Sequence, residues 1–231
     1  MIVTIDGPAG TGKSTVARIL AQRLGFEFLN TGAMYRAVAY VCLQREIELS
    51  NDEAVGHVPP QIEILFANNR LLLDGHDVTE AIHGQEVTQG ASLVAANPIV
   101  RVHLVELQRA AARGTDLVTE GRDQGTVVFP NAECKFFLTA SAEERALRRQ
   151  IELQAKGEFI PLNDLLTQQA VRDERDETRT CSPLVPALDA AVIDTTHMTL
   201  DSVAAHLESL VRQQIESREC ISKLAPCASE V

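Results

Sequence analysis

The feature that constrains this chain most is a glycine-rich stretch near its start, Gly7-Pro-Ala-Gly-Thr-Gly-Lys-Ser14. A short β-branched apolar run, residues 2–5, precedes it, and from residue 13 to 24 apolar residues recur at helical spacing. The stretch therefore has the form GxxxxGK[ST] between a predicted strand and a predicted helix, the setting in which backbone N–H groups surround phosphate oxygens. The sequence thus predicts an α/β fold that opens with a phosphate-binding loop, or P-loop.

This motif assigns chemistry to individual side chains. We expect Lys13 to reach the β- and γ-phosphates of a nucleoside triphosphate and the Ser14 hydroxyl to ligate Mg²⁺. No lysine follows an asparagine, so the guanine-recognition motif NKxD is absent and a GTPase is disfavoured. The predicted ATP-binding residues are Gly7, Pro8, Ala9, Gly10, Thr11, Gly12, Lys13, Ser14 and Thr15.

Strand and helix patterns alternate along most of the chain, which predicts a parallel sheet flanked by helices. Two apolar runs separated by Asn68-Asn69 interrupt the alternation and indicate a hairpin in an inserted lobe. A capping box, Ser141-Ala-Glu-Glu144, is expected to open an arginine-bearing helix. Strands are expected at 2–5, 26–29, 61–67, 70–73, 116–119, 135–138 and 191–193, and helices at 13–24, 33–43, 98–112, from 141, up to 179 and from about 199.

The same patterns suggest a division of the chain. We expect core segments at 1–35, 113–147 and 183–216, an inserted lobe for a nucleoside monophosphate at 36–112, a helical lid at 148–182 and a flexible tail at 217–231. The tail is predicted because its residues lack clear periodicity.

Composition excludes several classes of protein. The formal net charge of −11 disfavours a protein that coats nucleic acid. The five cysteines are scattered without zinc-binding spacing, which fits a reducing cytoplasm. The first residues have no basic segment and no long apolar run, so neither a signal peptide nor a membrane span is expected.

Three segments could hold a second anion beside the P-loop, as phosphoryl transfer requires. They are Thr31-Gly-Ala-Met-Tyr-Arg36, Glu120-Gly-Arg-Asp-Gln-Gly-Thr126 and the charged helix with Arg172, Arg175, Asp176 and Arg179 on one face. By itself the helix face could equally be a solvated ladder of ion pairs. Beside a P-loop it is better explained as the wall of a lid that excludes water.

Taken together, TIDGPAGTGKST, NTGAMYRA, TEGRDQGTVVFP, RDERDETR and SPLVPA resemble bacterial cytidylate kinases, over about residues 2–210. The P-loop is generic, whereas TGAMYR and GRDxGTVVFP are specific to that family. The resemblance implies a monomeric, cytoplasmic enzyme of pyrimidine metabolism with a P-loop core, a lobe for the monophosphate and a lid. It would transfer the γ-phosphate of ATP to CMP or dCMP, with Mg²⁺.

The resemblance also implies roles for individual residues. Arg36, Arg122 and Arg179 would hold the acceptor phosphate, Thr31, Arg172 and Asp176 the sugar, and Ser92, Arg101 and Asp123 the cytosine; Lys13, Arg122 and Arg179 would be catalytic. The base assignment makes chemical sense, because a carboxylate accepts from cytosine N4 and an arginine donates to N3 and O2.

Two positions depart from the common family pattern, and two other functions stay open. Asn30 stands where an aspartate is usual, and Glu120 stands where aspartate is frequent, so the part that each plays, including whether Glu120 holds the water shell of Mg²⁺, is left open.

A kinase for another monophosphate, such as UMP, is the alternative function within the class. A P-loop nucleotide sensor without turnover is the alternative outside it, and would lack a second anion site.

Overall fold

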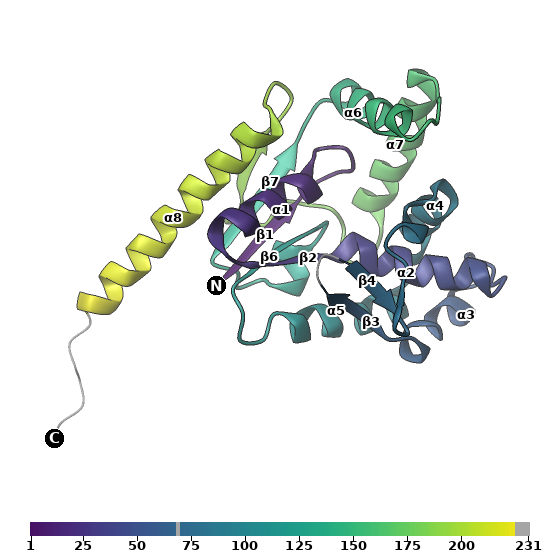
Figure 1. Cartoon of the computed structure of the whole chain (residues 1–231), viewed down its shortest axis with the longest axis horizontal. Helices are drawn as coiled ribbons and strands as arrows, with labels where there is room; N and C mark the ends of the chain where they lie inside the picture. The colour runs from purple at the N-terminus through teal and green to yellow at the C-terminus, as the bar shows by residue number, and fades with distance from the viewer. Residues whose placement is uncertain (68–69, 225–231) are drawn as a thin grey trace.

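A five-stranded parallel sheet forms the centre of the molecule, in a computed structural model that describes residues 1–67 and 70–224 (Figure 1). Its strand order is β2-β6-β1-β7-β8, and every neighbouring pair runs parallel. The strands are β1 (Ile2–Asp6), β2 (Glu27–Asn30), β6 (Leu117–Gly121), β7 (Cys134–Thr139) and β8 (Ala191–Asp194). All five strands that the sequence predicts for this sheet are confirmed to within about two residues, a normal uncertainty at strand ends.

Helices α1 (Lys13–Leu24) and α8 (Leu200–Leu224) lie side by side along one face of this sheet (Figure 1). Val16 and Leu20 of α1 and Leu207 of α8 are fully buried against Val3 and Ile5 of β1. Burial of such side chains contributes about 1.5–3 kcal/mol each. This core fixes the strand that carries the P-loop.

The inserted segment builds a second core on the side of the sheet away from α8 (Figure 1). It contains α2 (Thr31–Gln44), α3 (Asp52–Gly56), α4 (Gln85–Val94), α5 (Pro98–Ala111) and a three-stranded antiparallel sheet, β3 (Ile64–Ala67), β4 (Arg70–Leu73) and β5 (His76–Asp77). The predicted hairpin pairing is confirmed, while its turn, Asn68-Asn69, lies outside the described residues. Helices α3 and α4 and strand β5 were not predicted individually.

Two helices, α6 (Ala142–Ala155) and α7 (Leu162–Thr178), pack on each other around a small apolar cluster of Ala146, Leu153 and Leu165. The Ser141 hydroxyl caps α6 by accepting from the Glu144 backbone N–H at 3.2 Å. The reciprocal half of the predicted capping box is absent here, because the Ser141 N–H donates to the Thr196 hydroxyl at 3.0 Å instead.

The C-terminal prediction needs a correction. Helix α8 continues to Leu224, so residues 217–224 are helical where an irregular tail was expected; residues 225–231 lie outside the description. An ion pair of 2.6 Å between Arg218 and Glu133 ties this extension to the start of β7, a contact that periodicity alone does not show. None of the helices within the described residues is long and apolar enough to span a bilayer.

Candidate active site

The P-loop joins β1 to α1 at the carboxyl edge of the sheet, where open α/β folds bind ligands (Figure 1). Gly7 has φ +143°, and a Cβ there would lie 2.0 Å from the Leu138 carbonyl oxygen of β7. Only glycine fits this position, since other residues rarely adopt such a φ and the strand leaves no room. The tight turn carries the chain directly to the N-terminus of α1, whose dipole favours an anion.

Lys13 and Ser14 begin α1 and turn back toward the loop and the sheet. The Lys13 ammonium donates to the Pro8 carbonyl at 2.5 Å and to the Thr11 hydroxyl at 3.3 Å. Burial lowers the pKa of Lys13 well below its usual value, and the charge of Arg122 lowers it further. The Ser14 hydroxyl donates to the Glu120 carboxylate at 2.8 Å, which places this buried acid at the end of β6 beside the P-loop.

Four cations from four elements gather next to the loop, and we call them the four-cation cluster: Lys13, Arg36 of α2, Arg122 after β6 and Arg172 of α7. Burial lowers the pKa of Arg172 to about 10, with the charge of Arg122 as the next cause. Burial also lowers the pKa of Arg36. The Nε atoms of Arg36 and Arg172 are buried and have no hydrogen-bond partner among the residues that the structure describes. Since unpaired buried donors are costly, this cluster suits bound anions.

A second group, the base-side cluster, lies between α5 and the segment after β6. Arg101 and Asp123 form an ion pair in which both side chains are almost fully buried, at 3% and 4% exposure. The Arg101 guanidinium also lies 5.7 Å from the ring centre of Tyr35 and donates to the Ala95 carbonyl at 3.1 Å. The charges of Arg101 and Asp123 therefore balance each other within the protein.

Arg179 lies with this second cluster and not with the four cations. Its guanidinium donates to the Ser182 carbonyl at 2.6 Å and to the Ala95 carbonyl at 3.4 Å, which Arg101 shares. Burial lowers the pKa of Arg179, and the nearby charge of Arg101 is the next cause. Its Nη2 atom is buried and finds no partner within residues 1–67 and 70–224. The role of Arg179 on the acceptor phosphate accordingly stays a prediction.

The charged face of α7 reaches across to other elements. Asp176 accepts from Arg122 at 2.9 Å, and Arg175 donates to the Ser92 hydroxyl of α4 at 3.1 Å. The face is therefore not an intrahelical ladder of ion pairs, which was the alternative that the spacing left open. Asp176 is largely buried, and after the opposing effect of burial the charge of Arg122 is the main influence that lowers its pKa.

Other predicted residues have local partners. The Thr31 hydroxyl donates to the Glu120 backbone carbonyl at 2.7 Å. Asn30 caps α2, with its side-chain oxygen accepting from the Ala33 N–H at 3.0 Å, a function that an aspartate could also perform. The replacement of the usual aspartate by Asn30 therefore keeps the cap of α2.

Sequence reasoning missed two buried polar contacts of the site. Asp6, at the end of β1, accepts backbone N–H groups from the turn after β6. Arg145 of α6 donates to the Ala9 carbonyl of the P-loop at 3.1 Å and pairs with Asp173 of α7 at 2.6 Å. The signal for Asp6 was present, since an acid that directly precedes the motif ends a strand buried on both sides.

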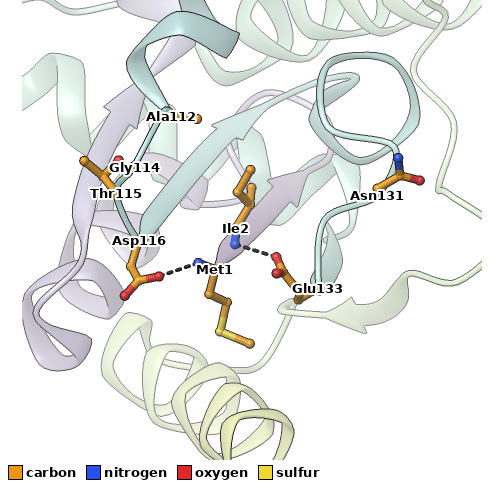
Figure 2. Close-up of a pocket in the computed structure, with 8 residues that line it drawn as sticks. All are labelled: Met1, Ile2, Ala112, Gly114, Thr115, Asp116, Asn131 and Glu133. Atoms are coloured by element: carbon orange, nitrogen blue, oxygen red, sulfur yellow. Dashed lines mark hydrogen bonds and ion pairs between the residues drawn. The ribbon is translucent and has the colours of Figure 1, made fainter. Parts of the chain in front are cut away.

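A pocket at the opposite edge of the sheet is lined by other residues (Figure 2). There the N-terminal ammonium of Met1 pairs with Asp116, and the Ile2 N–H donates to Glu133 at 2.7 Å. It lies at the amino ends of the strands, far from the P-loop. None of the predicted site residues lines it.

Comparisons with known proteins identify the family of the chain. The family model described as Cytidylate kinase matches residues 3–213. A cytidylate kinase of Desulfitobacterium hafniense (strain Y51) is 45% identical over 218 residues, covering 93% of this chain and 94% of that protein. One of Stutzerimonas stutzeri (strain A1501) is 45% identical over 216 residues, covering 91% and 94%. A solved structure of an uncharacterized protein from Eubacterium ventriosum has a TM-score of 0.50 at 12% identity, covering 92% of this chain and 98% of that one, a likeness of fold alone.

Proposed function

The chain belongs to the cytidylate kinase family, and from this premise we propose that it transfers the γ-phosphate of ATP to CMP or dCMP. The products are ADP and CDP or dCDP. The observation that carries the proposal is the four-cation cluster beside the P-loop, in which the buried Nε atoms of Arg36 and Arg172 lack a partner among the described residues. A triphosphate and a monophosphate held side by side would supply the anions that these donors lack.

Such a site needs no general base. An oxygen of the acceptor phosphate is already an anion; it forms the new bond to the γ-phosphorus while the bond from that phosphorus to the β,γ-bridging oxygen breaks, and ADP leaves with the electron pair. Lys13 and Arg122 would neutralise the charge on the transferred group, and the closely packed α7 would exclude water. Catalysis is then positioning together with charge stabilisation.

The residues present fit a magnesium ion. Ser14 and Glu120, whose oxygen atoms lie 2.8 Å apart, provide a hydroxyl and a carboxylate, which are hard oxygen ligands. The described residues contain no cluster of three or more acidic, histidine or cysteine side chains that could hold a metal without phosphates. We propose that Ser14 ligates Mg²⁺ and that Glu120 holds its water shell. When bound, the ion would neutralise charge on the ATP phosphates.

The base-side cluster is proposed to read the cytosine. Asp123 would accept from N4, while Arg101 and Ser92 would contact the ring acceptors; Thr31, Arg172 and Asp176 would hold the sugar. Because Arg101 and Asp123 pair with each other, the base must share both groups. For Arg179 to reach the acceptor phosphate, the end of α7 must shift from its contacts with Ser182 and Ala95.

The remaining assignments rest on sequence and family resemblance. We propose a monomer that acts in the cytoplasm, with a core at 1–35, 113–147 and 183–216, a monophosphate lobe at 36–112 and a lid at 148–182. The second antiparallel sheet within 36–112 and the α6–α7 pair around its own apolar cluster support this division.

A coupled assay of ADP release tests the proposal. With ATP and Mg²⁺, CMP and dCMP should give ADP faster than UMP or AMP, and ADP release without an acceptor should be slow. Lys13→Ala should lower kcat by about 10²–10³, as loss of a transition-state donor does. Lys156→Ala, which removes an exposed lysine of the same charge on α6, is the control and should behave as wild type. Equal rates with and without acceptor, or a preference for UMP, would contradict the proposal.

A further inference from the structure

The segment that follows β6 carries two acceptor-site residues and then makes a π-helical turn, Gln124–Val128. Asp123 stands at its N-cap, with φ −145°, yet its side chain does not cap the turn. The carboxylate is directed to Arg101 instead. The first N–H groups of a helical turn need acceptors, and an aspartate at the N-cap ordinarily provides one. Another group must therefore do so here.

Asp6 provides it from the neighbouring strand. One carboxylate oxygen accepts from the Gln124 N–H at 2.9 Å and the other from the Gly125 N–H at 2.8 Å. Asp6 ends β1, lies opposite Gly121 in the β1–β6 register and immediately precedes the P-loop residue Gly7. A single buried side chain, 5% exposed, thus links the start of the ATP loop to the acceptor segment.

We infer that Asp6 is a positioning residue that caps the turn after β6 in place of Asp123, so that Asp123 can pair with Arg101 and contact the base while Arg122 is held beside it. This inference rests on the proposed function, because it assigns Asp6 a task in the binding of the acceptor nucleotide. Asp6 contacts neither Arg122 nor Asp123 by a hydrogen bond in the described structure; it acts through the backbone that follows them.

The rest of the turn is held equally firmly. At its other end, Arg109 of α5 donates to the Val128 and Val127 carbonyls at 3.0 and 2.9 Å. A carboxylate at the N-terminal end and a guanidinium at the C-terminal end match the dipole of the turn. A Cβ on Gly125 would lie 2.9 Å from the Thr4 hydroxyl, so the turn also packs tightly on β1. Little freedom remains for the two residues that precede it.

The electrostatics of Asp6 favour positioning over stability. Burial raises the pKa of Asp6 to about 7 and the charge of Asp123 raises it too, while the two N–H groups and Lys13 oppose the shift. The folded protein therefore binds this proton more tightly than the unfolded chain, so stability falls as pH rises from about 4 toward 7. Ionising Asp6 therefore costs folding free energy, and the two backbone N–H groups that it accepts are the contacts that oppose this cost.

Asp6→Asn tests the inference, with Thr4→Val as the matched control. Asparagine has nearly the same shape but turns an N–H₂ group toward one of the two backbone N–H groups. Thr4 lies two residues earlier on β1 and faces the same turn, and its buried hydroxyl has no hydrogen-bond partner in the described part of the chain. We expect Asp6→Asn to lower kcat/KM for CMP at least about tenfold and to reduce the ratio of kcat/KM for CMP over UMP several-fold. Thr4→Val should change neither.

The ratio of kcat/KM for CMP over UMP separates a positioning role from a loss of folded protein, because such a loss lowers the apparent kcat/KM of both substrates equally. If Asp6→Asn lowers kcat/KM for CMP and for UMP by the same factor, or leaves kcat/KM for CMP unchanged, the inference is overturned. Asp6→Ser, which keeps one acceptor oxygen, is used if Asp6→Asn does not fold, and should shift the same ratio. If neither Asp6 variant folds while Thr4→Val does, Asp6 is a folding determinant and the positioning role is refuted. Wild-type turnover of CMP in the same assay tests the proposed function separately.

Discussion

The four-cation cluster and the base-side cluster each include a residue that directly follows β6, Arg122 and Asp123, but they differ in how their charges are balanced. Burial and neighbouring cations lower the pKa of Lys13, Arg36 and Arg172. The pKa of Arg122 is raised instead, because the opposing effect of burial is outweighed by the charges of Asp176 and Glu120. Only Arg122 of these four has a paired carboxylate, Asp176, in the described part of the chain. Arg101 and Asp123 form an internal pair, with Tyr35 beneath the guanidinium. The first cluster has a surplus of positive charge, while the Arg101–Asp123 pair of the second is balanced within the protein.

This difference matches what the two halves of a nucleotide need. A phosphate brings its own negative charge, so the protein can leave cations unpaired and gain affinity when they are neutralised. A cytosine is neutral and offers only hydrogen-bond donors and acceptors. A buried charged side chain that recognises it must therefore have a partner of opposite charge within the protein. It follows that residues of the first cluster should matter for activity and hardly for stability, whereas those of the second should matter for both.

The largest contrast is expected between Arg101→Met and Arg36→Met. Arg101→Met leaves Asp123 buried without its partner and should cost about 3–5 kcal/mol of the free energy of unfolding. Arg36→Met removes an unpaired cation from a cationic cluster and should leave stability unchanged or slightly raised. Urea unfolding without nucleotide measures both.

The Arg36→Met variant should nevertheless lose activity, although its stability is hardly changed. The kcat/KM of Arg36→Met for CMP should fall by about 10²- to 10³-fold in correctly folded protein. If Arg36→Met is destabilised as strongly as Arg101→Met, the distinction between the two clusters is wrong.

A smaller effect, confined to the base, is expected for Asp123→Asn. The amide can turn its N–H₂ toward uracil O4, which the carboxylate cannot do. The variant should therefore lose more kcat/KM with CMP than with UMP. The ratio of kcat/KM for CMP over UMP should fall at least about tenfold, or about 1.4 kcal/mol. Steady-state kinetics with both acceptors measure this. Equal losses would mean that Asp123 only orients its neighbours and that the base is read elsewhere.

The smallest effect is expected for Ser92→Ala. The hydroxyl accepts from Arg175 at 3.1 Å, so its loss removes one partly buried hydrogen bond, worth about 0.5–1.5 kcal/mol. We expect a few-fold rise in KM for CMP with little change in kcat. Arg175→Met removes the same contact from the α7 side and is the matched comparison. If it reproduces the full effect of Ser92→Ala, the serine serves to dock α7 and does not contact the base.

The local sequence pattern was sufficient to predict those parts of the structure that one continuous segment forms. The P-loop could be predicted because Gly7, Lys13 and Ser14 are placed by a single strand–turn–helix unit, and α1 begins and ends where periodicity and Gly25 indicated. The strands of the parallel sheet followed from short apolar runs for the same reason. The identities of Arg122, Asp123 and Arg172 as candidates also came from motifs within one segment.

Which of these residues meet was decided only by the tertiary structure. Ser14 and Glu120 are 106 residues apart, Arg101 and Asp123 are 22 apart, and Asp6 and Gln124 are 118 apart. Such contacts depend on the order β2-β6-β1 and on the register that sets Asp6 beside Gly121, and neither periodicity nor motif spacing encodes strand order. The helix at 217–224 and the place of Arg179 beside Arg101 have the same origin, because long-range partners outweigh weak local preferences.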